Sequence, residues 1–270
     1  MKKIPFTPLI SLVLPIYNGE RFLKESLESI LNQTFKKFEL IVVDDGSTDN
    51  SIELVKSYND SRIRVIKNKR NLGSVAAINI ALKNSKGKYI AVCTQDDISH
   101  PKRFEIEFNY LEKHPQIFLV GSSAIYINEG GKEIRRFRKY NHPKILAWRL
   151  RKSNGIIFPS IMFRNKDVIF NNHYEYHFYY RLLKRGEMLT NIPNFLVKYR
   201  VHSNAESVFD KERQDKLSKE VIEEFKTLRD PTNIIEKADY SFRLILHYLR
   251  TFKEKRLSKQ NFKIFLPPFF

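Results

Sequence analysis

The sequence predicts an α/β protein with a mostly parallel central sheet, helices on both faces of that sheet, and a helical C-terminal tail. Three observations support this prediction. Short, apolar, β-rich runs alternate with amphipathic segments over the first 125 residues. Two of these runs, 41–43 and 89–93, have the composition of buried parallel strands. From residue 205 onward, charged and amphipathic helical segments replace this alternation.

Four helices are expected in residues 1–121. In the segment 20–32, apolar residues recur near a period of 3.6, which predicts a helix. Asp49 is expected to cap a helix over 49–58. Gly73 precedes a helix over 74–84, and Pro101 occupies the first position of a helix over 101–113. The strands are expected at 10–14, 38–43, 63–67, 88–93 and 117–120.

The pattern changes after residue 121. Two β-rich runs, 124–128 and 133–137, flank Glu129-Gly130-Gly131 and predict a hairpin. The remaining expected elements are a basic helix over 142–152, a strand over 159–164, an aromatic helix over 174–185 and a strand over 195–201. We therefore divide the chain into residues 1–121, 122–204 and 205–270.

The tail admits two interpretations. Helices are expected at 211–228 and 239–257, and the segment 263–270 places phenylalanines beside a lysine. Such residues suit peripheral contact with an anionic membrane. The alternative is packing against the rest of the chain or a second subunit. No stretch of about 18 uninterrupted apolar residues occurs, so no membrane-spanning helix is expected.

The chain is strongly basic. It has 48 Lys+Arg against 30 Asp+Glu, a formal net charge of +18, and the segment 132–152 contains a single acid, Glu133. This excess favours a polyanionic neighbour: nucleic acid, an anionic membrane or a phosphate-bearing substrate. No RNP, KH or zinc-finger signature occurs, so specific nucleic-acid binding is not expected. The single cysteine, Cys93, excludes an internal disulfide and fits a reducing compartment.

Two acidic pairs are the most informative motif. Asp44-Asp45 and Asp96-Asp97 each follow an expected buried strand. Carboxylates at the C-terminal ends of parallel strands lie where open α/β sheets bind ligands. They suit a hard divalent cation shared with a diphosphate; the alternative is turn and helix-cap chemistry. No Walker, Gly-x-Gly-x-x-Gly or zinc-spaced pattern occurs, which weighs against NTPases, dinucleotide dehydrogenases and zinc enzymes.

Several motifs together resemble the family 2 glycosyltransferases, which have the GT-A fold with a Rossmann-like sheet. The resemblance covers about residues 9 to 205. It rests on the segments 11–20, 29–35 and 44–49, on Asn71-Leu72-Gly73, 77–79 and 87–90, on Asp96-Asp97-Ile98 leading to 101–103, and on 158–164 and 199–203. It implies that residues 1–121 bind the nucleotide sugar, and that residues 122–204 bind the acceptor and carry catalysis.

The resemblance also implies an activity. The expected enzyme is an inverting, metal-dependent glycosyltransferase that moves a sugar from a nucleotide diphosphate sugar, commonly a UDP-sugar, to a hydroxyl of a glycan or lipid-linked acceptor. Its setting would be synthesis of a cell-surface polysaccharide such as a lipopolysaccharide or capsule. It would work in the cytoplasm, at the inner face of the plasma membrane if the tail contacts lipid.

Individual roles carry over by motif. Pro15 and Tyr17 are implied to shape the base pocket, and Asp45 and Asp44 to contact the uridine. Further residues implied beside the nucleotide are Gly73, Asn79 and Gln95. Asp96 is implied to bind Mn²⁺ or Mg²⁺ together with the sugar diphosphate, with Asp97 as a second ligand. His202, in a Tyr-Arg-x-His pattern, is a further candidate for contact with the metal or diphosphate.

Two positions depart from the family pattern. Thr94 stands where the metal motif usually begins with Asp. The usual Glu-Asp pair of the catalytic base aligns with Tyr174-Glu175, which makes Glu175 the expected base; a shifted alignment makes His177 the base. A third outcome is a weak or inactive member that binds a sugar nucleotide or acts as a scaffold.

The basic stretch 132–152 borders the expected acceptor side. We expect it to bind a phosphorylated or lipid-linked acceptor, with a solvated surface as the alternative. The residues assigned to this role are Arg135, Arg136, Arg138 and Trp148.

Overall fold

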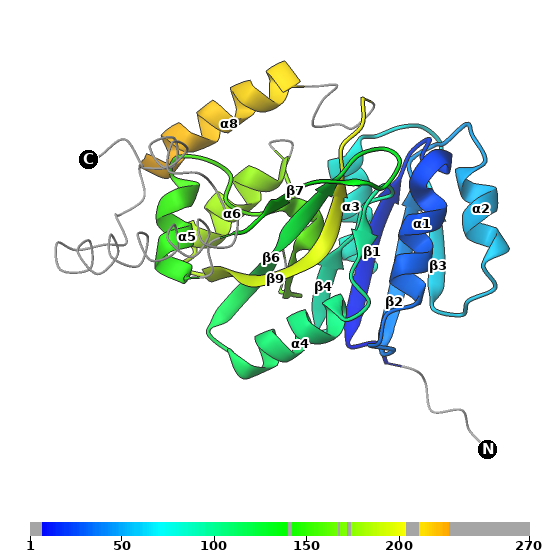
Figure 1. Ribbon diagram of the computed structural model, residues 1–270, viewed down its shortest axis with the longest axis horizontal. Helices are drawn as coiled ribbons and strands as arrows, with labels where there is room; N and C mark the ends of the chain where they lie inside the picture. Colours follow the sequence, from blue (N-terminus) through cyan, green and yellow to red (C-terminus); the bar gives the residue numbers. More distant parts are fainter. Residues whose placement is uncertain (1–6, 140–141, 167, 172–173, 204–210, 227–270) are drawn as a thin grey trace.

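The computed structural model describes residues 7–139, 142–166, 168–171, 174–203 and 211–226 (Figure 1). Within these residues a nine-stranded sheet forms the centre of the molecule. The strands are β1 (Ile10–Ile16), β2 (Phe38–Asp44), β3 (Ile63–Lys67), β4 (Tyr89–Val92), β5 (Ile98–Ser99), β6 (Ile117–Ile127), β7 (Glu133–Phe137), β8 (Met162–Arg164) and β9 (Met188–Arg200). The helices are α1 (Glu20–Leu31), α2 (Ser51–Ser57), α3 (Ser74–Lys83), α4 (Arg103–Lys113), α5 (Pro143–Leu150), the short η1 (Phe158–Ser160), α6 (Tyr174–Lys184) and α8 (Lys211–Lys226).

The sheet is mixed and mostly parallel. Its order is β3-β2-β1-β4-β8-β6-β9-β5, with β7 paired to β6. The strands β1 to β4 run parallel to one another. The strand β8 is antiparallel to both β4 and β6. Because β9 is parallel to β6, the strands β1, β2, β4, β6 and β9 all end at the same side of the sheet.

Alternating strand residues build two hydrophobic cores, one on each face of the sheet. One core joins Val13 and Ile41 to α3, α5 and α6. The other joins Leu12 and Leu40 to α1, α2 and α4. Figure 1 shows α1 and α2 at one end of the molecule and α5, α6 and α8 at the other. The expected arrangement of helices on both faces is therefore confirmed.

Most expected elements are present, with differences that arise from pairing between strands. The runs 117–120 and 124–128 form one strand, β6, because Gly121 and Ser122 pair with β9 despite their weak β propensity. The strand β9 begins at Met188 rather than 195. Between Ile192 and Phe195 its register shifts, which accommodates Pro193. The helix expected from Asp49 begins at Ser51, whose N–H donates to Asp49 Oδ1 at 3.0 Å.

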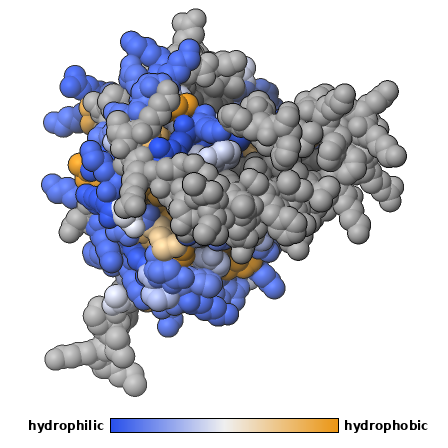
Figure 2. Space-filling model, turned by 90° about the vertical axis from the view of Figure 1, so that its left-hand side faces the viewer, coloured by the Kyte–Doolittle hydropathy of each residue, from blue (hydrophilic) through white to orange (hydrophobic). Residues whose placement is uncertain are grey.

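The first helix of the tail packs on the main body. Phe225 of α8 is buried against Tyr176 and Tyr180 of α6, at ring-centroid distances of 5.4 and 5.2 Å. The expected helix over 239–257 and the segment 263–270 lie outside the described residues. None of the described helices has the length and apolar character to cross a bilayer. The coloured surface in Figure 2 is mainly hydrophilic with small hydrophobic spots.

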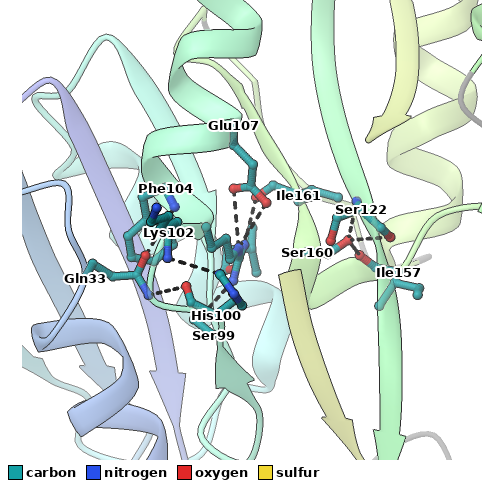
Figure 3. Close-up of polar contacts among 12 residues, drawn as sticks. Gln33, Ser99, His100, Lys102, Phe104, Glu107, Ser122, Ile157, Ser160 and Ile161 are labelled. Atoms are coloured by element: carbon teal, nitrogen blue, oxygen red, sulfur yellow. Dashed lines mark hydrogen bonds and ion pairs between the residues drawn. The ribbon is translucent and has the colours of Figure 1, made fainter. Parts of the chain in front are cut away.

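A buried arginine, Arg103, lies against the carboxyl end of β4. Arg103 is 1% exposed and pairs with Glu107 at 3.1 Å. Its Nη2 donates to the backbone oxygen of Val92 at 2.9 Å, and its Nη1 donates to Ser99 Oγ at 3.1 Å. Figure 3 shows this group beside Gln33, whose side-chain amide bonds the backbone of His100 and Phe104. These bonds satisfy backbone groups that no strand partner reaches.

We predict that Glu107→Ala destabilises the fold strongly. Burial outweighs the attraction of Arg103 and raises the pKa of Glu107 to about 7, so the pair is ionised at pH 8. Removal of the carboxylate leaves the Arg103 guanidinium buried without a counter-charge, at a cost of about 3–5 kcal/mol. Urea unfolding at pH 8 measures this loss. The control, Glu133→Ala, breaks an exposed pair with Arg136 and is expected to unfold at nearly the wild-type urea concentration.

Candidate active site at the carboxyl edge of the sheet

The motif residues of the N-terminal half meet at one edge of the sheet, which we call the carboxyl edge. It comprises the chain that follows β1, β2, β4 and β9, including Tyr17, Asp45, residues 94–97 and His202. Parallel strands place their carboxyl ends together, which brings these segments side by side although they are far apart in sequence.

The first two loops of the edge are joined by direct hydrogen bonds. The N–H of Gly19 donates to Ser51 Oγ at 2.9 Å, and the N–H of Glu20 donates to Asp49 Oδ2 at 3.0 Å. Asn18 holds a left-handed backbone with φ of 45°, and its Oδ1 accepts from the N–H of Thr48 at 2.9 Å. The Ser-Thr-Asp part of the motif thus fixes the turn that follows β1, next to the exposed Tyr17.

Asp45 is a structural anchor as well as a motif residue. It is buried, and its two oxygens accept the N–H of Leu72 at 3.0 Å, the N–H of Gly73 at 2.7 Å and the Asn68 side-chain amide at 2.7 Å. Gly73 has φ of 92°, a conformation that favours glycine. The carboxylate therefore holds the 68–73 loop at the edge. Asp45 and Gly73, which are both expected at the nucleotide, lie together there.

Asp44 differs from its neighbour. Its side chain is buried; Oδ1 accepts the N–H of Ser47 at 3.0 Å, and Lys67 Nζ lies 3.8 Å from Oδ2. Within the described residues, Oδ2 has no hydrogen-bond partner. Asp44 thus retains one oxygen with unused hydrogen-bonding capacity.

Two amides expected at the nucleotide bond the protein backbone. Asn79 bonds both backbone groups of Phe170, at 2.7 and 2.8 Å, and ties α3 to the segment before α6. Gln95 accepts from the N–H of Tyr17 at 2.9 Å and donates to its carbonyl at 3.1 Å. Gln95 therefore links the turn after β4 to the end of β1, where Pro15 and Tyr17 lie.

Asp96 and His202 come together although 106 residues separate them in sequence. His202 Nε2 lies 3.0 Å from Asp96 Oδ2, and the His202 ring contacts Phe22 at a centroid distance of 5.0 Å. Both side chains are partly buried. The sequence motifs proposed each residue separately, and the structure brings the two into one pair.

Asp97 is held apart from this pair. Its Oδ1 accepts the N–H of Arg200 at 2.8 Å, and its Oδ2 accepts the hydroxyl of Thr94 at 2.6 Å. Burial, together with the Asp96 charge, raises the pKa of Asp97 to about 8. Because both oxygens of Asp97 already accept hydrogen bonds from the protein, Asp96 is the stronger candidate for a cation ligand. Thr94, where the family usually has Asp, serves as a donor to Asp97.

Arg200 organises this region and is a residue that the sequence reasoning missed. Its Nε donates to the backbone oxygen of Asp96 at 2.9 Å, its Nη1 to that of Glu129 at 2.6 Å, and its Nη2 pairs with Glu25 at 2.8 Å. The guanidinium also lies 4.6 Å from the centroid of the Phe22 ring. The signal in the sequence is the Tyr-Arg-x-His pattern, in which Arg200 stands two residues before His202.

The donor set fits a cation that is shared with a ligand. Among the described residues, no group of three or more His, Cys, Asp or Glu side chains could hold a metal alone. Asp96 and His202 supply one carboxylate and one imidazole. Mn²⁺ and Mg²⁺ are commonly bound by one or two protein groups together with substrate phosphates.

The two base candidates point to different neighbours. Glu175, in the first turn of α6, accepts from the Asn154 side-chain amide at 3.4 Å. His177 lies 3.2 Å from Glu224 of α8. Positions two apart on a helix are about 200° apart around its axis. Glu175 and His177 therefore cannot serve the same point in space.

Of the residues assigned to the acceptor, Arg135 and Arg136 lie on β7, Arg138 directly follows β7, and Trp148 lies on α5. Arg135 stacks on Tyr126 at 5.0 Å, Arg136 pairs with Glu133 at 2.9 Å, and Arg138 lies 5.4 Å from the Phe195 ring centroid. Trp148 of α5 lies under Lys152, whose Nζ is 4.1 Å from the ring centroid. All five residues of β7 are exposed.

We predict that Arg200→Lys loosens the 94–97 turn. Lysine keeps the charge but cannot make the three directed bonds of the guanidinium. The expected loss in unfolding free energy is about 2 kcal/mol or more, with faster amide hydrogen exchange at Asp96 and Asp97. The control Arg21→Lys alters an exposed pair with Glu129 and should leave exchange there unchanged; equal exchange in both variants would contradict the role of Arg200.

The chain is similar to known proteins of one family. The family model described as glycosyl transferase family 2 matches residues 11–185. An uncharacterized glycosyltransferase of Methanocaldococcus jannaschii is 36% identical over 223 residues, covering 78% of this chain and 76% of the relative. An uncharacterized glycosyltransferase of Haemophilus influenzae is 33% identical over 235 residues, covering 80% and 73%.

Solved structures share the fold. The crystal structure of S. aureus TarS 1-349 in complex with UDP-GlcNAc aligns with a TM-score of 0.64 at 18% identity, covering 82% of this chain and 68% of that one. The mannosyltransferase PcManGT from Pyrobaculum calidifontis, in complex with GDP-Man and Mn²⁺, aligns with a TM-score of 0.59 at 17% identity, covering 76% and 61%. The GT-A fold expected from the sequence is thus confirmed, and the chain belongs to glycosyl transferase family 2.

Proposed function

We propose that this protein is an inverting glycosyltransferase that transfers a sugar from a nucleoside diphosphate sugar, with UDP as the expected nucleotide, to a hydroxyl of a glycan or lipid-linked acceptor. The observation that carries the proposal is the Asp96–His202 pair at 3.0 Å, which lies at the same edge of the sheet as the loop that Asp45 holds. The proposal also draws on fold neighbours crystallised with UDP-GlcNAc and with GDP-Man and Mn²⁺.

Asp96 and His202 would hold the divalent cation, Mn²⁺ or Mg²⁺. The bound cation would supply positive charge to the departing nucleoside diphosphate. Asp96 is positioned for this role because Arg200 fixes its backbone oxygen and because Asp97 is engaged by Thr94 and Arg200. Tyr17, Asp44 and the 68–73 loop would line the base and ribose, since they lie at the carboxyl ends of β1, β2 and β3.

Glu175 would accept the proton of the attacking hydroxyl. It is half-buried in the first turn of α6, and its carboxylate accepts a hydrogen bond from the Asn154 side-chain amide. A base on the acceptor side, opposite the leaving diphosphate, allows the hydroxyl to displace the nucleotide in one step and to invert the anomeric carbon. The contact of His177 with Glu224 of α8 favours Glu175 over His177 for this role.

The biological setting is proposed on charge and family. A formal charge of +18 and the basic face of β7 and α5 suit an anionic acceptor such as a phosphorylated or lipid-linked glycan of a cell-surface polysaccharide. The same charge suits work in the cytoplasm at the inner, anionic face of the plasma membrane. Specific nucleic-acid binding is not proposed, because the sequence has no RNP, KH or zinc-finger signature. The alternative is a weak or inactive family member that binds a sugar nucleotide or acts as a scaffold. The reason to keep this alternative is that Thr94 stands where the metal motif usually has Asp.

Calorimetric titration of UDP, GDP and dTDP, with and without Mn²⁺, tests the donor site. We expect one nucleotide to bind in a metal-dependent way, and Asp96→Ala to weaken that binding by about tenfold or more, because a charged ligand to the cation is lost. Glu105→Ala, which removes the α4 carboxylate that accepts from the Thr34 hydroxyl at 2.8 Å, is the control. Failure of all three nucleotides to bind wild type would reject the proposal.

Turnover with a UDP-sugar and acceptor separates the two bases. Glu175→Gln keeps the shape and the hydrogen bond from Asn154 but cannot take a proton, so we expect turnover to fall about 10²–10⁴-fold while UDP affinity stays near wild type. His177→Gln is expected to retain most of its turnover. A normal rate in Glu175→Gln together with a large loss in His177→Gln would move the base to His177.

A further inference from the structure

Lys139 is a buried cation that the proposed mechanism does not use. It follows β7 and is 8% exposed. Its N–H donates to Ser123 Oγ of β6 at 3.0 Å, and its Nζ lies 4.5 Å from the centroid of the Phe137 ring. Burial, with smaller contributions from the Arg149 and Arg135 charges, lowers the pKa of Lys139 to about 8.

No carboxylate of the described residues lies within 4.0 Å of Lys139 Nζ, and the two charges that act on this ammonium are both positive. The other buried cations differ, since Arg103 pairs with Glu107 and Arg200 with Glu25. A buried charge without a counter-ion is costly. An anionic ligand bound beside Lys139 would supply the missing counter-charge.

The surroundings of Lys139 join the basic face to the helix of the proposed base. Arg135 of β7 stacks on Tyr126 and Phe137, at 5.0 and 5.2 Å. Arg149 of α5 lies close enough to Tyr176 of α6 for its charge to lower the pKa of that phenol, which burial raises. Tyr176 is next to Glu175 in sequence, and its hydroxyl bonds the backbone of Leu150 in α5. Lys139, Arg135 and Arg149 therefore lie near α6, the helix that carries the proposed base.

We propose that Lys139, Arg149 and Arg135 form an anion site that binds a phosphate group of the acceptor, an inference that rests on the proposed glycosyl transfer. Burial makes Lys139 the centre of the site, because an ammonium shielded from water attracts phosphate more strongly than an exposed one. Arg136 makes its ion pair within its own strand, with Glu133, and is not part of the site.

The site can be tested on the full chain with inorganic phosphate as the probe, in EDTA so that a cation-bound donor site does not contribute. Ionic strength is matched with chloride, since any basic protein binds anions weakly. We expect phosphate to bind wild type in a saturable way, and Lys139→Met to weaken binding by about tenfold or more. Lys139→Arg should retain part of the affinity. Lys132→Met removes an exposed charge at the start of the same hairpin and should bind phosphate like wild type.

Thermal unfolding gives a second readout, whose measurement without phosphate does not depend on affinity. Without phosphate, Lys139→Met should unfold at the wild-type temperature or above, because an apolar side chain replaces a buried charge. Phosphate should raise the unfolding temperature of wild type more than that of Lys139→Met. Equal phosphate effects on affinity and unfolding in both proteins would overturn the site.

Titration of UDP with Mn²⁺ on the same variants separates this inference from the proposed function. Unchanged UDP affinity in Lys139→Met, together with a raised KM for a phosphorylated acceptor, supports the acceptor assignment. A parallel loss of UDP affinity would assign the cations to the donor and overturn it. If wild type bound phosphate through Lys139 but bound no nucleotide, glycosyl transfer would be rejected, and the acceptor assignment with it.

Discussion

The candidate site depends above all on the buried guanidinium of Arg200. Its hydrogen bonds join the end of β9, the turn after β4, the β6–β7 turn and α1. Without it, the backbone oxygen of Asp96 and the carbonyl of Glu129 would lose their donor in a region with little access to water, which is costly. Because His202 is two residues further on, the same bonds set the distance between His202 and Asp96.

Many motif residues of the family stabilise loops rather than extend toward a ligand. Asp45 accepts the backbone of the 68–73 loop, Asn79 bonds Phe170, and Gln95 bonds Tyr17. These bonds hold the loops of the carboxyl edge in place before any nucleotide arrives, which lowers the entropy lost on binding. The groups with remaining capacity are fewer: the Asp96–His202 pair and one oxygen of Asp44.

Charge is distributed in a way that suits two anionic substrates. The acids of the carboxyl edge can approach a diphosphate only through a cation, since carboxylate and phosphate repel each other. At the proposed acceptor site, Lys139 and its arginine neighbours would need no cation. A donor and an acceptor that both carry phosphate would therefore be bound by different chemistry in two different groups of residues.

The sequence by itself determined most of the strands and helices, because period-2 and period-3.6 apolar patterns depend on local geometry; the two-residue strand β5 was missed. It also placed the two acidic pairs at the carboxyl ends of β2 and β4, and the resemblance to family 2 led to the GT-A fold. The tertiary structure alone decided which acid can bind a ligand. Asp97 accepts hydrogen bonds from Thr94 and Arg200, whereas Asp96 lies beside His202. The joining of 117–120 with 124–128 into one strand, the roles of Arg200 and Lys139, and the contact of His177 with Glu224 were likewise decided there. Each depends on contacts between residues distant in sequence, and a pattern within one segment carries no record of its partner.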